Sequence, residues 1–282
     1  MKLENLIDRK SGWQKTILLT VQGYFTHNIG RTAAALVYYL LFAMFPFILF
    51  VTSLLGVLHL PMISLEGDFA AILPADVITL LNLAIVHVTE NSSATMLTLG
   101  LLFAIWFPFR AVSNLVGAVS EIYGCPRHGR QAWLPIAGLS LLTIVATPVV
   151  LLLLIFGEGV LYFIGKFIPL SNEFIQIFTR LRFMPMGGAL FFLLCAYYFF
   201  SPAKRQPARY ILPGAAVSVG IWVLFSWGFT YYTAHMARYS VLYGSIGAII
   251  AFFVWLNCST TTMLMGAVFN DARRKAEEYH RE

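Results

Sequence analysis

The sequence predicts an all-α integral membrane protein, with six transmembrane helices, some of them kinked, and short amphipathic helices at the membrane surface. Three observations lead to this fold class. Hydrophobic residues make up 59% of the 282 residues and charged residues only 11%, whereas soluble domains carry about 25% charged residues. Several apolar runs reach about 20 residues, the length that crosses a bilayer. The runs are continuous rather than alternating, which indicates helices and not a barrel.

The apolar runs form a single polytopic membrane domain over residues 1–282. The six predicted spans lie at about 33–60, 94–119, 133–156, 183–200, 210–234 and 241–269. Pro46 stands near the middle of the first span and predicts a kink, because its ring removes a backbone donor. Residues 1–32 carry apolar side chains at helical spacing, which predicts a helix either on the membrane surface or against the inner end of the protein. Residues 270–282 are a charged tail that we expect to continue the last helix.

Lysine and arginine fall unevenly on the two sides of these spans. With six spans both termini lie on one side, and that side holds 14 of the 19 basic residues, against four on the other. The positive-inside rule therefore places both termini in the cytoplasm. The net charge of +6 reflects topology and contact with anionic lipid, and it leaves no concentrated patch for nucleic acid. We also expect two short outer helices, at 77–88 and 169–182.

Sequence motifs for catalysis or cofactor binding are missing. The three cysteines form no CxxC pair, and the six histidines form no HExxH or HxxxH pattern. A disulfide framework, a metal site and a cofactor are therefore not expected. Cleavage of a phosphodiester needs clustered acids, histidines or metal ligands, so the sequence also argues against a ribonuclease, and no catalytic residue is assigned.

Arg110 is the only acidic or basic residue inside the six predicted spans. A charge within a membrane-length run is expensive and by default marks a functional site. By its position it lies at a similar depth to a polar run in the sixth span, in the inner half of the membrane. One interpretation is a chamber that holds an anionic group such as a lipid phosphate. Its residues would be Arg110, Asn257, Ser259, Thr260 and Thr261. The other interpretation is that Arg110 snorkels to the cytoplasmic surface.

Small residues recur four apart in the last two spans. Gly214 and Ser218 form one such pair, and Ser240, Gly244 and Ala248 form another series. This spacing is typical of helices whose backbones approach closely in a membrane. We interpret both faces as packing surfaces within the chain.

Three stretches carry a resemblance to a known family. They are RTAAALVYYLLFAMFPFIL, VSEIYGCPRHGR and YGSIGAIIAFFVWLNCSTTTMLMGAVFN, and they resemble the YihY/BrkB family of bacterial inner-membrane proteins, formerly mislabelled ribonuclease BN. The resemblance covers roughly residues 12–275 and implies six transmembrane helices with cytoplasmic termini in the inner membrane. It links the chain to serum resistance and to export of envelope lipid or lipopolysaccharide, without an agreed activity.

Eight residues match the family pattern, and we expect most of them to serve packing and kinking. They are Tyr38, Tyr39, Pro46, Tyr123, Tyr243, Gly244, Gly266 and Ala267. The chain departs from the pattern at Val268, where the family often has glutamate, so a mechanism that needs this carboxylate is in doubt here.

Two functions follow from these observations, and a solute channel or secondary carrier stays open beside them. The first is a translocator of a lipid or another anionic amphiphile, with membrane lipids and their anionic headgroups as partners. The second is a membrane scaffold or envelope-assembly protein that transports nothing.

Overall fold

The computed structural model describes residues 12–57, 79, 82–83, 94–126, 129, 132–146, 183–204, 206–235 and 237–279. Within these residues the chain is helical and contains no strand, as predicted. The main helices are α2 (Trp13–Thr26), α3 (Ile29–Val57), α5 (Ala94–Ile122), α8 (Phe183–Phe200), α9 (Ala208–His235) and α10 (Ala237–Tyr279). A further helix covers Ala132–Ala146. The predicted outer helices at 77–88 and 169–182 fall almost entirely outside the described residues.

Three of the helices are long and apolar enough to cross a membrane. These candidate spans are Leu97–Ile122, Ala208–Tyr232 and Ile249–Glu278. The apolar helices Ile29–Met44, Ala132–Ala146 and Met186–Phe200 are shorter, so a count of six spans remains a prediction. Continuous runs of Leu, Ile, Val and Phe explain these helices, since each backbone group must be satisfied within its own segment in lipid.

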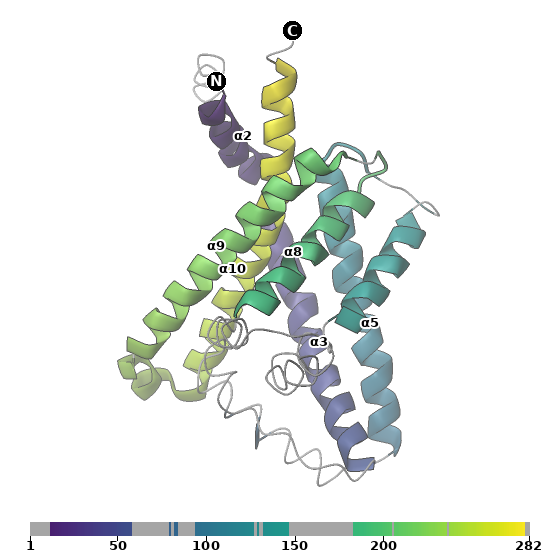
Figure 1. The fold of residues 1–282 in the computed structure, drawn as a ribbon. Helices are drawn as coiled ribbons and strands as arrows, with labels where there is room; N and C mark the ends of the chain where they lie inside the picture. The colour runs from purple at the N-terminus through teal and green to yellow at the C-terminus, as the bar shows by residue number, and fades with distance from the viewer. Residues whose placement is uncertain are drawn as a thin grey trace, which may run out of the picture.

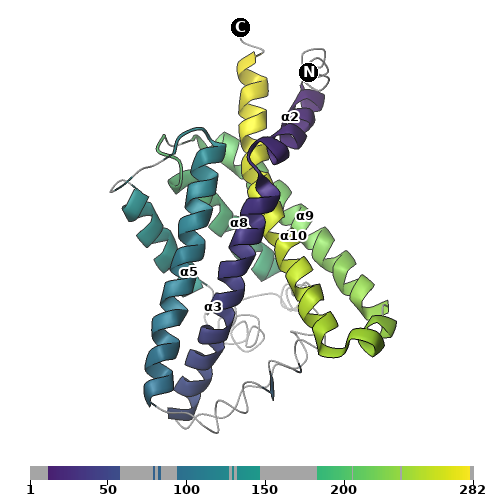
Figure 2. The ribbon, with the colours of Figure 1, turned by 180° about the vertical axis from the view of Figure 1, so that it is seen from behind.

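The helices are arranged as two long pairs that meet at one end (Figure 1). α3 packs along α5, and α9 packs along α10, with α8 beside α9. Figure 2 shows the α3–α5 pair and the α9–α10 pair spreading apart away from the end where α2 lies. We call the end with α2 and the last turns of α10 the projecting end. The first and last described residues both lie there.

α10 is longer than any membrane crossing requires. Its 43 residues extend about 64 Å at 1.5 Å per residue, against a hydrocarbon core of about 30 Å. The helix therefore continues through the charged segment that follows residue 269, as the sequence predicts for the tail. The predicted start at residue 241 is four residues late, and the first predicted span likewise begins four residues after the start of α3.

The N-terminal helix α2 packs against α10. The Trp13 and Phe269 rings meet edge to face at a centroid distance of 5.6 Å. A Cβ added to Gly23 would lie 2.5 Å from Val268, so only glycine permits this approach. Of the two interpretations of the N-terminal segment, contact with the protein's own end is thus observed. α2 joins α3 through a tight turn at Asn28, whose φ of 50° is one that asparagine tolerates.

The main apolar core lies toward the projecting end, where the helices converge. It combines Leu36 of α3, Val116 of α5, Leu194 of α8 and Leu264 of α10, each at most 4% exposed. A second cluster around Trp222, Phe252 and Trp255 joins α9 to α10 further along. Many apolar side chains of α5 and α9 face outward, as lipid-facing helix surfaces do.

Candidate functional site

Arg110 lies on the exposed surface of α5 and faces α3. It stands 13 residues after Leu97 and 12 before Ile122, and so at the middle of that candidate span. Its guanidinium carbon lies 5.9 Å from the centre of the Tyr39 ring, within the limit of a cation–π contact. Among the described residues Arg110 forms no ion pair. An unpaired cation therefore sits halfway along an apolar helix.

An aromatic ladder runs beside Arg110 across the α3–α5 pair, formed by Tyr38, Phe42, Phe103 and Phe107. Tyr38 contacts Tyr39 at 5.4 Å between ring centres and Phe42 at 4.6 Å. Phe42 in turn contacts Phe107 at 5.6 Å, and Phe107 contacts Phe103 at 5.9 Å. Tyr38, Phe42 and Phe103 are each more than 40% exposed. The ladder thus forms an accessible apolar surface that leads to the one cation.

The predicted polar run in α10 is divided between structural and available side chains. Ser259 accepts a hydrogen bond of 3.1 Å from the Trp222 indole. Thr260 is buried, and its hydroxyl reaches the carbonyls of Leu256 at 2.9 Å and Ala33 at 3.4 Å. These two residues are engaged in joining helices. Asn257 and Thr261 are half-buried and make no side-chain hydrogen bond within the described part of the chain.

Arg110 and the polar run do not lie at the same depth. Thr260 contacts Ala33 of α3, whereas Arg110 contacts Tyr39. These two α3 residues are six apart, which corresponds to about 9 Å along a helix. The expectation of equal depth is therefore wrong, because α5 and α10 pack against different parts of α3. Arg110 also lies at mid-span rather than in the inner half, and no hydrogen bond joins its guanidinium to the described residues of the polar run. A ligand role for the five residues remains a prediction.

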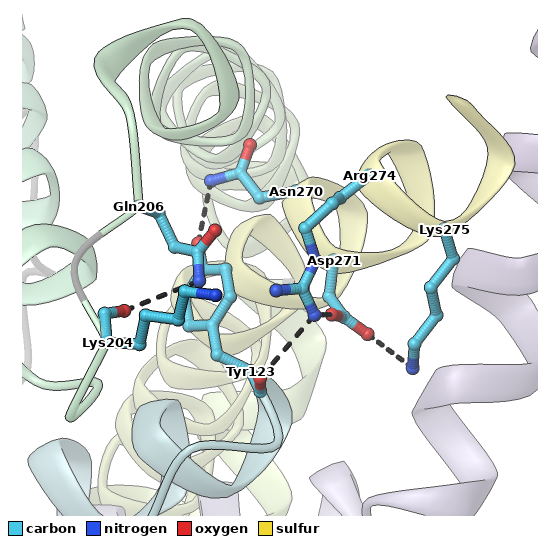
Figure 3. Close-up of polar contacts among 7 residues, drawn as sticks. All are labelled: Tyr123, Lys204, Gln206, Asn270, Asp271, Arg274 and Lys275. Carbon is cyan, nitrogen blue, oxygen red and sulfur yellow. Dashed lines mark hydrogen bonds and ion pairs between the residues drawn. The ribbon is translucent and has the colours of Figure 1, made fainter. Parts of the chain in front are cut away.

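A group of buried polar side chains joins α10 to its neighbouring helices. We call it the polar clamp, and Asn270 is its centre. The Asn270 side chain is 0% exposed. It accepts from the Gly214 backbone at 2.7 Å and donates to the Ile211 carbonyl and the Tyr123 hydroxyl, each at 3.1 Å. One amide thereby connects α10 with α9 and with the end of α5. Figure 3 shows the bond from Asn270 to Tyr123. Burial raises the pKa of the Tyr123 hydroxyl, which keeps it neutral.

Two further residues extend the polar clamp toward α8. Ser218 donates to the Thr262 carbonyl at 2.8 Å, and the Tyr198 hydroxyl donates to the Met263 carbonyl. A Cβ on Gly214 would overlap the Gly266 carbonyl, and a Cβ on Gly266 would overlap Ser218. The predicted close approach at Gly214 and Ser218 is confirmed, and Gly266 is its counterpart on α10.

The remaining family-pattern residues divide by location. Ala267 is 0% exposed in the core. α3 continues through Pro46 without a break in the helix, and Tyr243 and Gly244 lie in α10 outside the residues whose side chains are described. Val268 is buried against Gly23 of α2, which explains an apolar residue at this family position.

A group of charges lies next to the polar clamp at the projecting end. We call Lys204, Arg274 and Lys275, with the carboxylate of Asp271, the basic cluster (Figure 3). Asp271 forms ion pairs of 2.6 Å with both Arg274 and Lys275, and its side chain is only 5% exposed. Arg274 also donates to the Tyr123 carbonyl at 3.5 Å. The cluster thus links α10 to the end of α5.

Sequence reasoning missed the polar clamp and the basic cluster because both lie at span ends. Asn270 directly follows the predicted sixth span, where a polar residue is expected to meet water. The only local signal was its place four residues after Gly266, on the same helix face as the small residues. The charges of the basic cluster were counted for topology and not for mutual contact.

Comparison with known proteins gives a consistent family. The model of the family described as virulence factor BrkB matches residues 20–282. The ribonuclease-like protein YfkH of Bacillus subtilis (strain 168) is 26% identical over 258 residues, which cover 90% of this chain and 94% of that protein. Its enzyme-like name is the known mislabel of this family. No solved structure matches the chain.

Two similar membrane proteins align over shorter segments. A UPF0761 membrane protein of Chromobacterium violaceum is 32% identical over 97 residues, covering 32% of this chain and 23% of that protein. One from Pseudoalteromonas atlantica is 32% identical over 91 residues, covering 32% of this chain and 29% of that protein. The aligned segments thus span less than a third of these two relatives. The match over residues 20–282 shows that this chain belongs to the BrkB family, a membrane protein family of uncertain function and not a known enzyme family.

Proposed function

We propose that this chain is a bacterial inner-membrane translocator of a lipid or another anionic amphiphile, and that Arg110 contacts the anionic headgroup. The observation that carries the proposal is an exposed, unpaired cation at the middle of the Leu97–Ile122 candidate span. A cation within hydrocarbon is costly and needs an anionic partner. The described part of the chain offers Arg110 no carboxylate, whereas a lipid phosphate would provide charge-assisted hydrogen bonds.

The contact with Tyr39 favours this proposal over snorkelling. Arg110 stands 12 residues from Ile122, about 18 Å along the helix, which is longer than an arginine side chain. The guanidinium is instead held over the Tyr39 ring, at mid-span level. A cation–π contact is worth about 0.5–2 kcal/mol, too little to offset the desolvation of a charge. A second, anionic partner is therefore expected.

The aromatic ladder supports an amphiphile rather than a small hydrophilic anion. Its exposed rings form a continuous apolar surface beside the cation. Acyl chains pack on such a surface without loss of hydration, whereas a hydrated solute gains nothing there. A headgroup at Arg110 and chains along Tyr38, Phe42 and Phe103 would use both features.

The arrangement of the helices is compatible with six crossings and with cytoplasmic termini. α3, α5, the Ala132–Ala146 helix, α8, α9 and α10 run in alternating directions (Figure 1), with the Ala132–Ala146 helix and α8 shorter than the others. The projecting end carries Lys204, Arg209 and the basic residues that end α10. By the positive-inside rule this end is the cytoplasmic one.

Reconstitution in vesicles tests the proposal. The full chain, Arg110→Gln and Arg110→Lys are inserted into vesicles with fluorescent phosphatidylglycerol, and the fraction that chemical quenching reaches reports movement between leaflets. Loss of the guanidinium removes hydrogen bonds worth about 1.5–3 kcal/mol, so Arg110→Gln should slow movement at least tenfold. The control is Arg31→Gln, which removes an exposed charge at the start of α3. Movement no faster than in empty vesicles, with any anionic lipid, would sink the proposal.

A second candidate function is an envelope-assembly scaffold, and the outward face of α2 favours it. Trp13, Ile17, Val21 and Phe25 recur every four residues and are each more than 45% exposed, so they form an apolar stripe suited to a partner helix. A scaffold predicts that Arg110→Gln is silent in cells, whereas changing Val21 and Phe25 to serine, which leaves the Trp13–Phe269 contact in place, removes a copurifying partner. A translocator predicts the reverse.

A further inference from the structure

Arg274 in the basic cluster has unused hydrogen-bond donors. Its side-chain hydrogen bonds to Asp271 and to the Tyr123 carbonyl both come from Nη2. Its Nε is buried without a partner, and Nη1 makes no bond to a described residue. A buried N–H without an acceptor costs about 1–3 kcal/mol, and a bound ion is one standard explanation. The guanidinium therefore keeps unsatisfied donors at Nε and Nη1.

Lys204 supplies a second cation at the same place. It lies after α8 in the loop that leads to α9, and its side chain extends toward Tyr123 and the Arg274 guanidinium in Figure 3. Lys204 is exposed and forms no ion pair among the described residues. The carboxylate of Asp271 is already shared between Arg274 and Lys275. Lys204 and Arg274 thus leave a surplus of positive charge between α5, α10 and the α8–α9 loop.

We propose that Lys204 and Arg274 form a binding site for a phosphate group, carried by a lipid headgroup or free in the aqueous phase. Arginine presents a planar set of donors that matches phosphate oxygens in pairs, and lysine adds a point charge. Asp271 and the polar clamp hold Arg274 in place, so little side-chain entropy is lost on binding. The site lies about 20 Å from Arg110 along α5, since Tyr123 is 13 residues further on. It is therefore separate from the contact proposed for translocation.

Two variants test the site without unfolding the chain. Lys204→Gln removes a cation that is exposed and unpaired, so the fold should not respond. Arg274→Lys keeps the charge beside Asp271 but removes the paired donors. The matched control is Arg209→Gln, because Arg209 is exposed in the same region but stacks on Tyr210 at 4.8 Å. Lys204→Gln and Arg209→Gln lower the net charge equally.

Binding is measured on the full chain in neutral detergent by native mass spectrometry. The probes are dihexanoyl-phosphatidylglycerol, phosphate-free dihexanoylglycerol and inorganic phosphate. All variants are also made in an Arg110→Gln background, so that a lipid bound at Arg110 does not contribute. We expect affinity for phosphatidylglycerol to fall about threefold to fivefold in Lys204→Gln, as for an exposed charge pair. The fall should reach about tenfold in Arg274→Lys, and Arg209→Gln should stay within twofold of the parent.

The outcomes separate the source of the phosphate from the existence of the site. Binding of phosphatidylglycerol without binding of inorganic phosphate identifies a lipid headgroup as the source. Binding of inorganic phosphate as well identifies a free phosphate. Either result supports the site if Lys204→Gln weakens the binding. An equal loss in Lys204→Gln and Arg209→Gln indicates general charge attraction and overturns the proposal. So does the lack of any preference for the phosphatidylglycerol or phosphate probe over dihexanoylglycerol, which carries no phosphate. Lipid movement that depends on Arg110 is read in a separate assay, so either proposal can fail alone.

Discussion

Replacement of Asn270 by leucine should destabilise the fold more than any other single polar-to-apolar change among the described residues. The leucine is similar in size but leaves the Gly214 N–H, the Ile211 carbonyl and the Tyr123 hydroxyl without their Asn270 partner. Hydrogen bonds between membrane helices average about 0.6 kcal/mol, and those in soluble proteins reach about 1.5 kcal/mol. Three such bonds give a loss of about 2–5 kcal/mol.

Thermal unfolding of the purified chain in detergent measures this loss. At about 2–4 °C per kcal/mol for a chain of this size, the midpoint should fall by roughly 4–20 °C. The control is Asn114→Leu, because among the described residues the Asn114 side chain bonds only the Arg110 carbonyl of its own helix, at 2.9 Å. Tyr123→Phe should cost about 1 kcal/mol in the parent and almost nothing in Asn270→Leu, since the partner is already lost. Equal midpoints for Asn270→Leu and Asn114→Leu would refute the polar clamp.

Three further changes test other contacts by thermal unfolding. Gly266→Ala should lower the midpoint because its Cβ overlaps Ser218, whereas Gly220→Ala, in open space, should not; equal effects would contradict the close crossing. Val268→Glu buries a carboxylate at the α2 contact and should lower the free energy of unfolding by several kcal/mol. An unchanged midpoint would contradict the packing of α2 at this residue. Burial, and then Lys275, lower the pKa of His27, so the folded state binds fewer protons than the unfolded state. Stability is complete above pH 6.5 and falls as the pH drops through the folded pKa; His27→Gln should remove this dependence.

The fold class could be predicted because it depends on composition and on the length of apolar runs. Helix starts were placed up to four residues late, because polar or basic residues such as Asn28 and Arg31 were assigned to the flanking segments. In the structure α3 begins at Ile29. It packs against α2 and α10, and this packing stabilises its first turn beyond the apolar run. Charge at a helix end does not limit the helix, because the hydrocarbon core covers only its middle.

The candidate site was predicted in part. Arg110 could be found from the sequence, because a lone charge in an apolar run is visible without a structure. Its partner Tyr39 could not, because that contact depends on how α3 and α5 pair. The predicted depth of Thr260 relative to Arg110 was wrong for the same reason. Counting residues from the predicted start of each span ignores how far one helix is shifted along its axis relative to another. Asn270 was missed because its role depends on the Gly214 backbone, 56 positions earlier in the chain.

The two proposed phosphate contacts lie at different levels of α5: Arg110 is at its middle, and Lys204 with Arg274 lies beside Tyr123 at its end. They are about 20 Å apart on α5, compared with about 15 Å from a headgroup region to the bilayer centre. If one headgroup uses both, it passes from the projecting end to mid-membrane, and Lys204→Gln should then lower the rate of lipid movement mainly at low lipid content. Arg110→Gln should lower it at every lipid content, since it acts after binding. If the basic cluster instead holds a static lipid, Lys204→Gln changes retained lipid and leaves the rate unchanged at all contents.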